Sequence, residues 1–114
     1  MLTIEALNAY GANTGEGLNR CMNNEAFYFR LIGMALADGN FEKLRDALEA
    51  GDLAAAFESA HALKGVLGNL SLTPLYQPAS ELTELLRVRA EGDYMGLLAE
   101  ILRQRDRLAE ISQD

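Results

Sequence analysis

The sequence predicts an all-α fold: an antiparallel up-down four-helix bundle with one or two short extra N-terminal helices. Leucine and alanine greatly outnumber β-branched residues, and the chain holds only two prolines. Apolar residues recur every three or four positions, which is the helical period. The segments between these periodic stretches are short, so consecutive helices are expected to lie antiparallel.

The N-terminal segment predicts short helical pieces. Thr3 can cap a first helix that runs to Tyr10. Residues 11–17 contain three glycines and indicate a loop or a helix break. Thr14 can then cap a short turn that continues through Met22.

Two longer helices are expected next. Asn24 is the candidate N-cap of a helix over residues 25–38, which an Asp-Gly-Asn sequence ends. Its expected apolar face consists of Met22, Phe29, Ile32 and Leu36. The following helix covers residues 41–50, with Gly51 at its C′ position. Its expected apolar side consists of Phe41, Leu44 and Leu48.

The next helix begins after Asp52, a good N-cap, and carries His61, the only histidine. Its predicted core face is an apolar stripe with a turn of about 100° per residue. The stripe consists of Leu53, Phe57, Ala60, Leu63, Leu67 and Leu70. His61, Gly65 and Gly68 lie along the flank of this stripe. The positions expected to point further outward are Glu58, Ser59 and Ala62.

The last two helices are predicted from their N-terminal caps. Thr73 and Pro74 predict an N-cap followed by proline at the first helical position. Pro78 predicts an irregular first turn, and the helix is expected to end near Arg89. Asp93 is the expected cap of the final helix. Its apolar stripe consists of Leu98, Ile101, Leu108 and Ile111.

Length and charge limit the class of protein. We expect one domain over residues 1–114. The net charge of −7 is a poor match for nucleic acids or anionic membranes, because both need a clustered basic surface. There is no transmembrane run or secretory signal pattern, so we expect a cytoplasmic protein without membrane insertion, and a monomer. Cys21 has no second cysteine to pair with and is interpreted as a small buried side chain.

Several kinds of chemistry are excluded by missing motifs. The chain has no glycine-rich phosphate loop, so no nucleotide site is expected. One histidine and one cysteine cannot supply a transition-metal or di-iron site, so we expect no bound metal or other cofactor. There is no strained nucleophile turn for a serine hydrolase. His61 is therefore the main candidate for chemistry.

His61 has two interpretations. It is either a partly buried histidine that hydrogen-bonds a neighbouring helix, or a reactive imidazole on a bare surface. Ala60 and Ala62 flank it, and Gly65 and Gly68 follow on its own face, which leaves little to pack on the ring. Each glycine costs a helix about 1 kcal/mol relative to alanine. This pattern favours a surface kept bare so that another molecule can reach the ring.

Lys64 lies about one helical turn from His61. A cation beside an imidazole disfavours the protonated ring, so a nitrogen lone pair is available as a nucleophile. If that nitrogen were phosphorylated, the ammonium group would stabilise the new anion. The alternative for Lys64 is an exposed lysine that only aids solubility.

The stretch from His61 to Ser71, His-Ala-Leu-Lys-Gly-Val-Leu-Gly-Asn-Leu-Ser, resembles the histidine-containing phosphotransfer (HPt) domain of two-component signalling. It matches the family's His-x-Leu-Lys-Gly motif and the later glycine at Gly68. Ser71 stands where the family usually has glycine, and Leu67 where a small residue is common. We interpret Ser71 as a change of local backbone and Leu67 as a change of core packing, both bearing on partner preference.

The resemblance implies a phosphorelay carrier without kinase activity of its own. His61 would accept a phosphoryl group, usually through Nε2, from an aspartyl phosphate on a receiver domain and pass it to another receiver aspartate. Lys64 would lie near the phosphoryl group, and Gly65 and Gly68 would give the receiver room to approach. The implied partners are a response-regulator receiver domain and/or a hybrid histidine kinase, with Mg²⁺ bound by the receiver.

Two alternative functions stay open. A helical module could bind a receiver or kinase without transfer, but it would have no need for His61 and Lys64. An enzyme with His61 as general base would need a carboxylate partner and an enclosed pocket. Arg87 and Arg89 are interpreted as solvated arginines rather than docking residues. Met1 and the polar C-terminal tail favour a free-standing protein over part of a longer kinase.

Overall fold

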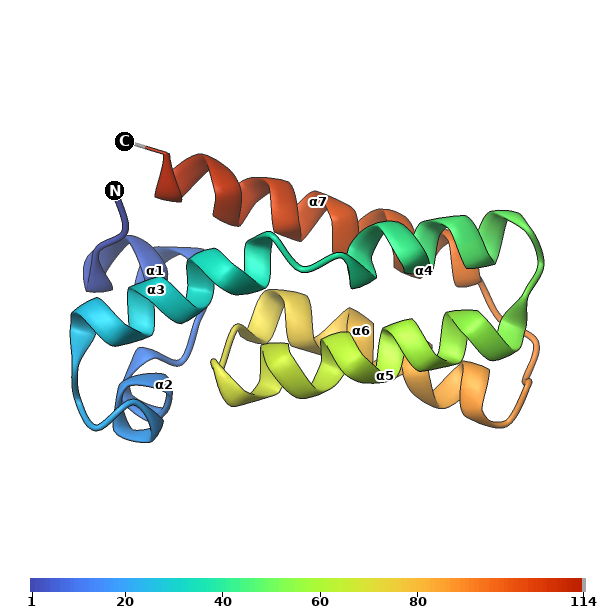
Figure 1. The fold of residues 1–114 in the computed structure, drawn as a ribbon, viewed down its shortest axis with the longest axis horizontal. Helices are drawn as coiled ribbons and strands as arrows, with labels where there is room; N and C mark the ends of the chain where they lie inside the picture. The colour runs from blue at the N-terminus through green and yellow to red at the C-terminus, as the bar shows by residue number, and fades with distance from the viewer. Residues whose placement is uncertain (114) are drawn as a thin grey trace.

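The computed structural model describes residues 1–113, and these residues form seven helices without a strand (Figure 1). The helices are α1 (Ile4–Tyr10), α2 (Thr14–Arg20), α3 (Glu25–Leu36), α4 (Asn40–Glu49), α5 (Leu53–Asn69), α6 (Thr73–Arg87) and α7 (Tyr94–Ser112). α3 and α4 follow one another along one edge, and α5, α6 and α7 then run alternately back and forth. The predicted all-α, antiparallel bundle with two short N-terminal helices is confirmed.

The first member of the bundle is a broken helix. α3 and α4 point the same way and are separated by residues 37–39 (Figure 1). The Asp38 carboxylate accepts the backbone N–H of Asn40 at 2.8 Å, which starts α4. α5 then packs against α4 on one side and α6 on the other, and α7 packs against α6. The helix that carries His61 therefore lies between two neighbours.

Most of the predicted caps are present. The side chains of Thr3, Asn24, Asp52 and Asp93 each accept a backbone N–H three residues further on. Gly51 follows α4 with a φ of +73°, a left-handed conformation that glycine adopts without steric cost. These short local motifs fix where the helices start and stop.

Two predicted caps are wrong by one residue. Asn13, not Thr14, caps α2 by accepting the N–H of Glu16. The Thr14 hydroxyl instead donates to the Asn8 side chain at 2.6 Å, across the turn from α1. The second difference is at α6.

α6 begins one residue earlier than predicted and ends sooner. Leu72 is its N-cap residue, so Thr73 is its first residue and Pro74 its second. Pro78 lies inside a continuous helix and is buried. The helix ends at Arg87 rather than near Arg89, because Arg89 has a φ of +53° and leaves the helical conformation.

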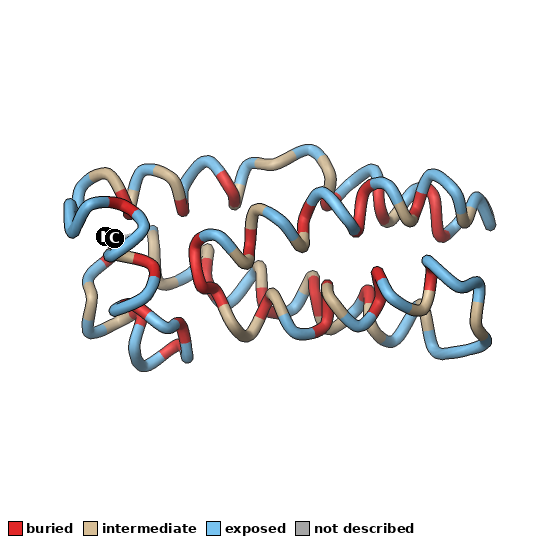
Figure 2. The backbone as a smooth tube through the Cα atoms, turned by 90° about the horizontal axis from the view of Figure 1, so that it is seen from below, coloured by how far each residue is buried: buried red, intermediate tan, exposed pale blue. Residues whose placement is uncertain are grey.

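The core lies along the inner faces of the helices (Figure 2). The predicted stripes of α4, α5 and α7 are buried or half-buried, and Cys21 is buried as expected. Within residues 1–113, no helix combines the length and the apolar character needed to cross a membrane.

Two face assignments are corrected. Met22 is 83% exposed and precedes α3. The buried face of α3 consists of Tyr28, Ile32 and Ala35. Ser59 is buried rather than outward-pointing. The reason is that α5 packs against both α4 and α6, so its buried arc is wider than one stripe.

Tyr28 joins three segments. Its hydroxyl donates to the Leu70 carbonyl at 2.8 Å, next to the end of α5. A Cβ atom at Gly17 would lie 2.5 Å from the same hydroxyl, so α2 can approach α3 here only with glycine at this position. Burial raises the pKa of Tyr28 to about 12. Tyr28 thus holds α2 and α3 against the C-terminal end of the histidine helix.

Candidate functional site

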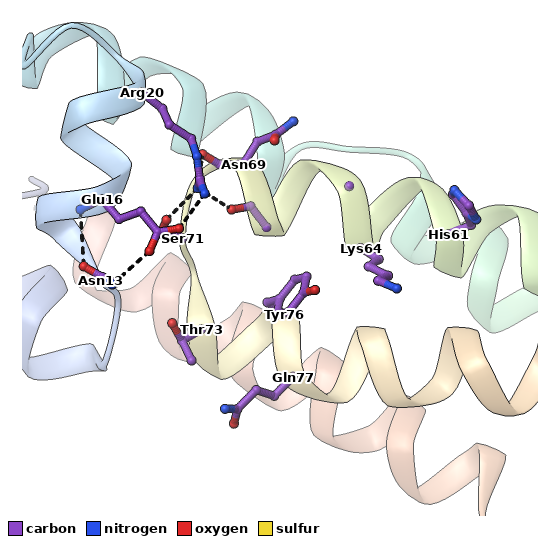
Figure 3. A pocket seen from close by; sticks show the side chains of 12 residues that line it. Asn13, Glu16, Arg20, His61, Lys64, Asn69, Ser71, Thr73, Tyr76 and Gln77 are labelled. Carbon is purple, nitrogen blue, oxygen red and sulfur yellow. Dashed lines mark hydrogen bonds and ion pairs between the residues drawn. The ribbon is translucent and has the colours of Figure 1, made fainter.

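An open groove of about 610 Å³ runs along α5 toward the start of α6. His61 and Arg20 lie at its opposite ends (Figure 3). Its walls come from residues 13–20, the second half of α5 and the first turn of α6. All four site residues predicted from the sequence line it: His61, Lys64, Gly65 and Gly68.

The imidazole of His61 is exposed on α5. The Phe57 ring, one turn earlier, meets it edge-on with ring centroids 5.5 Å apart. No hydrogen bond joins the imidazole to another of residues 1–113. A buried histidine that bonds a neighbouring helix, the alternative interpretation, does not fit this geometry. The ring is braced on one side and open to an approaching molecule.

Lys64 is not a free lysine. Its side chain, 29% exposed, extends toward α6 (Figure 3), and Nζ lies 3.3 Å from a Glu84 carboxylate oxygen. Arg87 Nε lies 3.2 Å from the other oxygen of Glu84. Hydrogen bonds from Arg87 and then Lys64 hold the pKa of Glu84 below its usual range. The ammonium predicted to serve His61 is therefore paired with a carboxylate on α6.

Arg87 connects this carboxylate to the histidine. Its guanidinium lies over the Phe57 ring, 5.0 Å from the centroid. Phe57 in turn contacts His61. Arg87 is therefore more than the solvated arginine that the sequence suggested. Arg89 differs, because its side chain donates to the Leu86 carbonyl at the end of α6.

The two glycines after the histidine have different surroundings. A Cβ atom at Gly65 would meet nothing within 4 Å, so this position is bare toward solvent. A Cβ atom at Gly68 would lie 2.9 Å from the Tyr76 ring on α6. Gly68 thus has a packing role within the bundle that the sequence did not reveal. Its role in docking stays a prediction.

The end of α5 is fastened by backbone and side-chain hydrogen bonds. Ser71 has a φ of +55°, the left-handed conformation that glycine usually provides after a helix. Its N–H donates to the Gly68 carbonyl, and the next N–H, of Leu72, donates to Leu67. Serine here keeps the helix-ending turn. Leu67 is buried, as its place on the core stripe predicted.

Arg20 reaches this turn from α2 (Figure 3). Its guanidinium donates to the Gly68 carbonyl at 2.8 Å, the Asn69 carbonyl at 3.3 Å and the Ser71 hydroxyl at 2.9 Å. The carbonyls at a helix end lack partners within the helix and favour a nearby cation. Arg20 also pairs with Glu16 at 2.5 Å. It therefore holds the site-bearing helix from outside the bundle.

Sequence reasoning missed Arg20, Glu84 and Tyr76. Each acts on α5 from another helix, across 20 to 51 residues in the case of the hydrogen bonds of Glu84 and Arg20. Helical periodicity describes one helix at a time and carries no signal for such contacts. The one hint in the sequence was Ser71, which stands where the family usually has glycine and whose hydroxyl accepts a hydrogen bond from Arg20.

Comparison with known families gives the assignment. The model of the Hpt domain matches residues 34–114. The chain belongs to the Hpt domain family. Neither the curated proteins nor the solved structures gave a match to it.

Hpt domains are phosphotransfer carriers of two-component phosphorelays, which hold a phosphoryl group on histidine and are generally not kinases. Their interaction partners are receiver domains or histidine kinases. The match begins at Met34, so α1, α2 and most of α3 precede the matched residues. The Hpt assignment thus includes His61 and its neighbours on α5 and α6, whereas Arg20 lies outside the match.

Proposed function

We propose that this Hpt domain is a phosphorelay carrier in the cytoplasm that accepts a phosphoryl group on His61 from one receiver aspartate and delivers it to another. The observation that carries the proposal is the open imidazole on α5, beside a lysine and an unfilled glycine position. A metal or nucleotide site in the carrier is not required, because the receiver would bring Mg²⁺ and the phosphoryl group arrives already activated.

The chemical step is an in-line displacement at phosphorus. The Nε2 lone pair of neutral His61 forms the new P–N bond, and the bond from phosphorus to the receiver's carboxylate oxygen breaks. The electron pair of that bond leaves with the carboxylate, and solvent takes the ring's remaining N–H proton. Phe57 supports this step by restricting the ring, since its edge contact leaves fewer orientations for the imidazole.

Lys64 is proposed to stabilise the phosphoryl group. It follows His61 by three residues, a spacing that puts two side chains on neighbouring positions of a helix surface. A charge-assisted hydrogen bond from its ammonium would offset the negative charge that arrives. Gly65 is proposed as a docking position, because its open surface lets a receiver come close to the helix backbone. Gly68 would contribute to the same surface further along the groove.

The proposal is tested by transfer from a receiver domain that carries an aspartyl phosphate. The full chain should gain label that acid removes and alkali does not, which distinguishes a phosphohistidine from an aspartyl phosphate. Because His61 is the only histidine, the variant His61→Gln should gain no label. Circular dichroism should show that this variant keeps its helices, since the exposed ring contributes little to the core.

A second receiver added afterwards should remove the label from the wild-type protein. Equal labelling of wild type and His61→Gln would contradict the proposal. Receiver binding without labelling of either protein would favour the alternative, a helical module that binds receivers or kinases without transfer.

A further inference from the structure

Lys64 follows His61 by three residues on α5 and pairs with Glu84 on α6. We propose that Glu84 is a positioning residue that holds the Lys64 ammonium in the unphosphorylated protein and releases it to the phosphoryl group once His61 is phosphorylated. The inference rests on the proposed function, because it requires a phosphoryl group on His61. It makes Glu84 a competitor that sets how strongly Lys64 stabilises that group.

One contact and the spacing along α5 give the Lys64 ammonium two alternative partners. Lys64 Nζ donates to a carboxylate oxygen of Glu84 across the α5–α6 interface. His61 lies about one turn away on the same helix, within reach of a long, flexible lysine side chain. A phosphoryl dianion carries more charge than a carboxylate and has three acceptor oxygens. Lys64 therefore gains by changing partners.

The exchange costs little because the pair is exposed. The side chains of Lys64 and Glu84 are 29% and 54% exposed. Water replaces part of what an exposed ion pair loses, so such pairs contribute little to stability. A buried pair would have tied the lysine permanently to its carboxylate.

Arg87 keeps Glu84 paired after Lys64 leaves. Arg87 Nε lies 3.2 Å from one carboxylate oxygen and Nη2 lies 3.4 Å from the other, a two-point contact that does not involve Lys64. The guanidinium is itself supported by the Phe57 ring. The carboxylate is thus left neither unpaired nor free to follow Lys64 toward the phosphoryl group.

The test needs no partner protein. Phosphoramidate, a small phosphoryl donor, is used to phosphorylate His61 in the full chain, with ammonia as the leaving group. The donor is then removed, and loss of phosphohistidine is followed by ³¹P NMR. The ring nitrogen must be protonated for the P–N bond to hydrolyse, and a cation on the phosphoryl group disfavours that protonation. A longer half-life therefore reports stronger engagement of Lys64.

Glu84→Gln keeps the size of the side chain and removes its charge. We expect it to lengthen the phosphohistidine half-life about three-fold, the size expected from one exposed ion pair. Lys64→Met should shorten the half-life. In the Lys64→Met background, Glu84→Gln should have little further effect, because the residue through which Glu84 acts is missing. Glu81→Gln, the same charge change one turn earlier on α6, is the matched control and should leave the half-life unchanged.

The same factor for Glu84→Gln with and without Lys64 would overturn the proposal, because Glu84 would then act by direct repulsion. An equal effect of Glu81→Gln would overturn it as well, because net charge would explain the result. If the wild-type protein is phosphorylated normally but Glu84→Gln leaves the phosphohistidine half-life unchanged, only this inference is contradicted. Wild-type protein that takes no phosphate at His61 would overturn the proposed function and this inference with it.

Discussion

The two ends of the groove are built differently. At the Arg20 end, the hydrogen bonds that hold the end of α5 go mainly to its main chain: Arg20 donates to the carbonyls of Gly68 and Asn69, and Tyr28 donates to that of Leu70. At the His61 end, the contacts join exposed side chains to one another, as in the Lys64–Glu84 pair. Main-chain contacts at a helix terminus fix the position of the helix. Exposed side-chain contacts can exchange partners without moving it.

This difference explains how one helix can be held firmly at one end and still present an open imidazole in its middle. The C-terminal end of α5 is held by segments from α2, α3 and α6. The middle of the helix, one to two turns away, keeps a free imidazole and a bare glycine. We therefore expect substitutions at the Arg20 end to change stability, and substitutions at the His61 end to change phosphotransfer.

The largest expected difference is between the two glycines. Gly68→Leu should lower the free energy of unfolding by about 1–3 kcal/mol, because the new side chain overlaps the Tyr76 ring. Gly65→Leu should raise it by up to about 1 kcal/mol, because leucine is the better helix former and meets no neighbour. Urea denaturation measures both effects.

Receiver binding tests the docking role of Gly65 separately from its effect on stability. Gly65→Leu should weaken binding of the receiver while the protein stays folded, which isolates the docking role of this position. Unchanged binding by Gly65→Leu would show that the bare surface is not needed for docking. A stability loss at Gly65 as large as that at Gly68 would contradict the comparison itself.

Arg20→Ala should have the next largest effect. It removes a cation from the carbonyl end of α5 and a hydrogen bond from Ser71, and should lower the free energy of unfolding by about 1–2 kcal/mol. Arg30→Ala is the control, because Arg30 is an exposed arginine on α3. Thermal unfolding compares the two variants, and an equal loss in both would show that the contacts of Arg20 with α5 do not stabilise the fold.

Tyr28→Phe should have a smaller effect at neutral pH, about 1 kcal/mol, from the lost hydrogen bond to Leu70. The effect that distinguishes this substitution is expected at alkaline pH, where the Tyr28 hydroxyl titrates. The folded protein holds the Tyr28 proton with a pKa of about 12, above the usual value of 10. The stability due to this group is therefore complete below pH 10 and lost as the pH rises to about 12.

Tyr28→Phe should accordingly flatten the fall of stability between pH 10 and 12, measured as urea midpoints across that range. Tyr76→Phe is the control, because no described residue accepts a hydrogen bond from the Tyr76 hydroxyl. A pH dependence unchanged in Tyr28→Phe would show that Tyr28 does not titrate with the fold.

Several errors of the sequence prediction concern positions that a second helix decides. The caps at Thr3, Asn24, Asp52 and Asp93 were predicted because a cap is a local contact over three residues. Ser59 was placed on the outside because its burial depends on the packing of α4 beside α5.

The residues of the candidate site fall into the same two groups, those predicted from one helix and those that another helix contributes. His61, Lys64 and Gly65 follow from spacing within one helix, together with the resemblance of the motif. Glu84, Arg87 and Arg20 joined the site only in the folded protein. Gly68 was singled out from the sequence as a docking position, but the ring that makes glycine necessary there belongs to α6.

The sequence by itself determined the helices, their order and the family, because helical period, caps and the histidine motif are all written in short stretches of chain. Only the tertiary structure decided which charge pairs with Lys64 and what holds the end of α5. Those contacts join residues far apart along the chain, and their energies depend on distances that exist only after the helices pack.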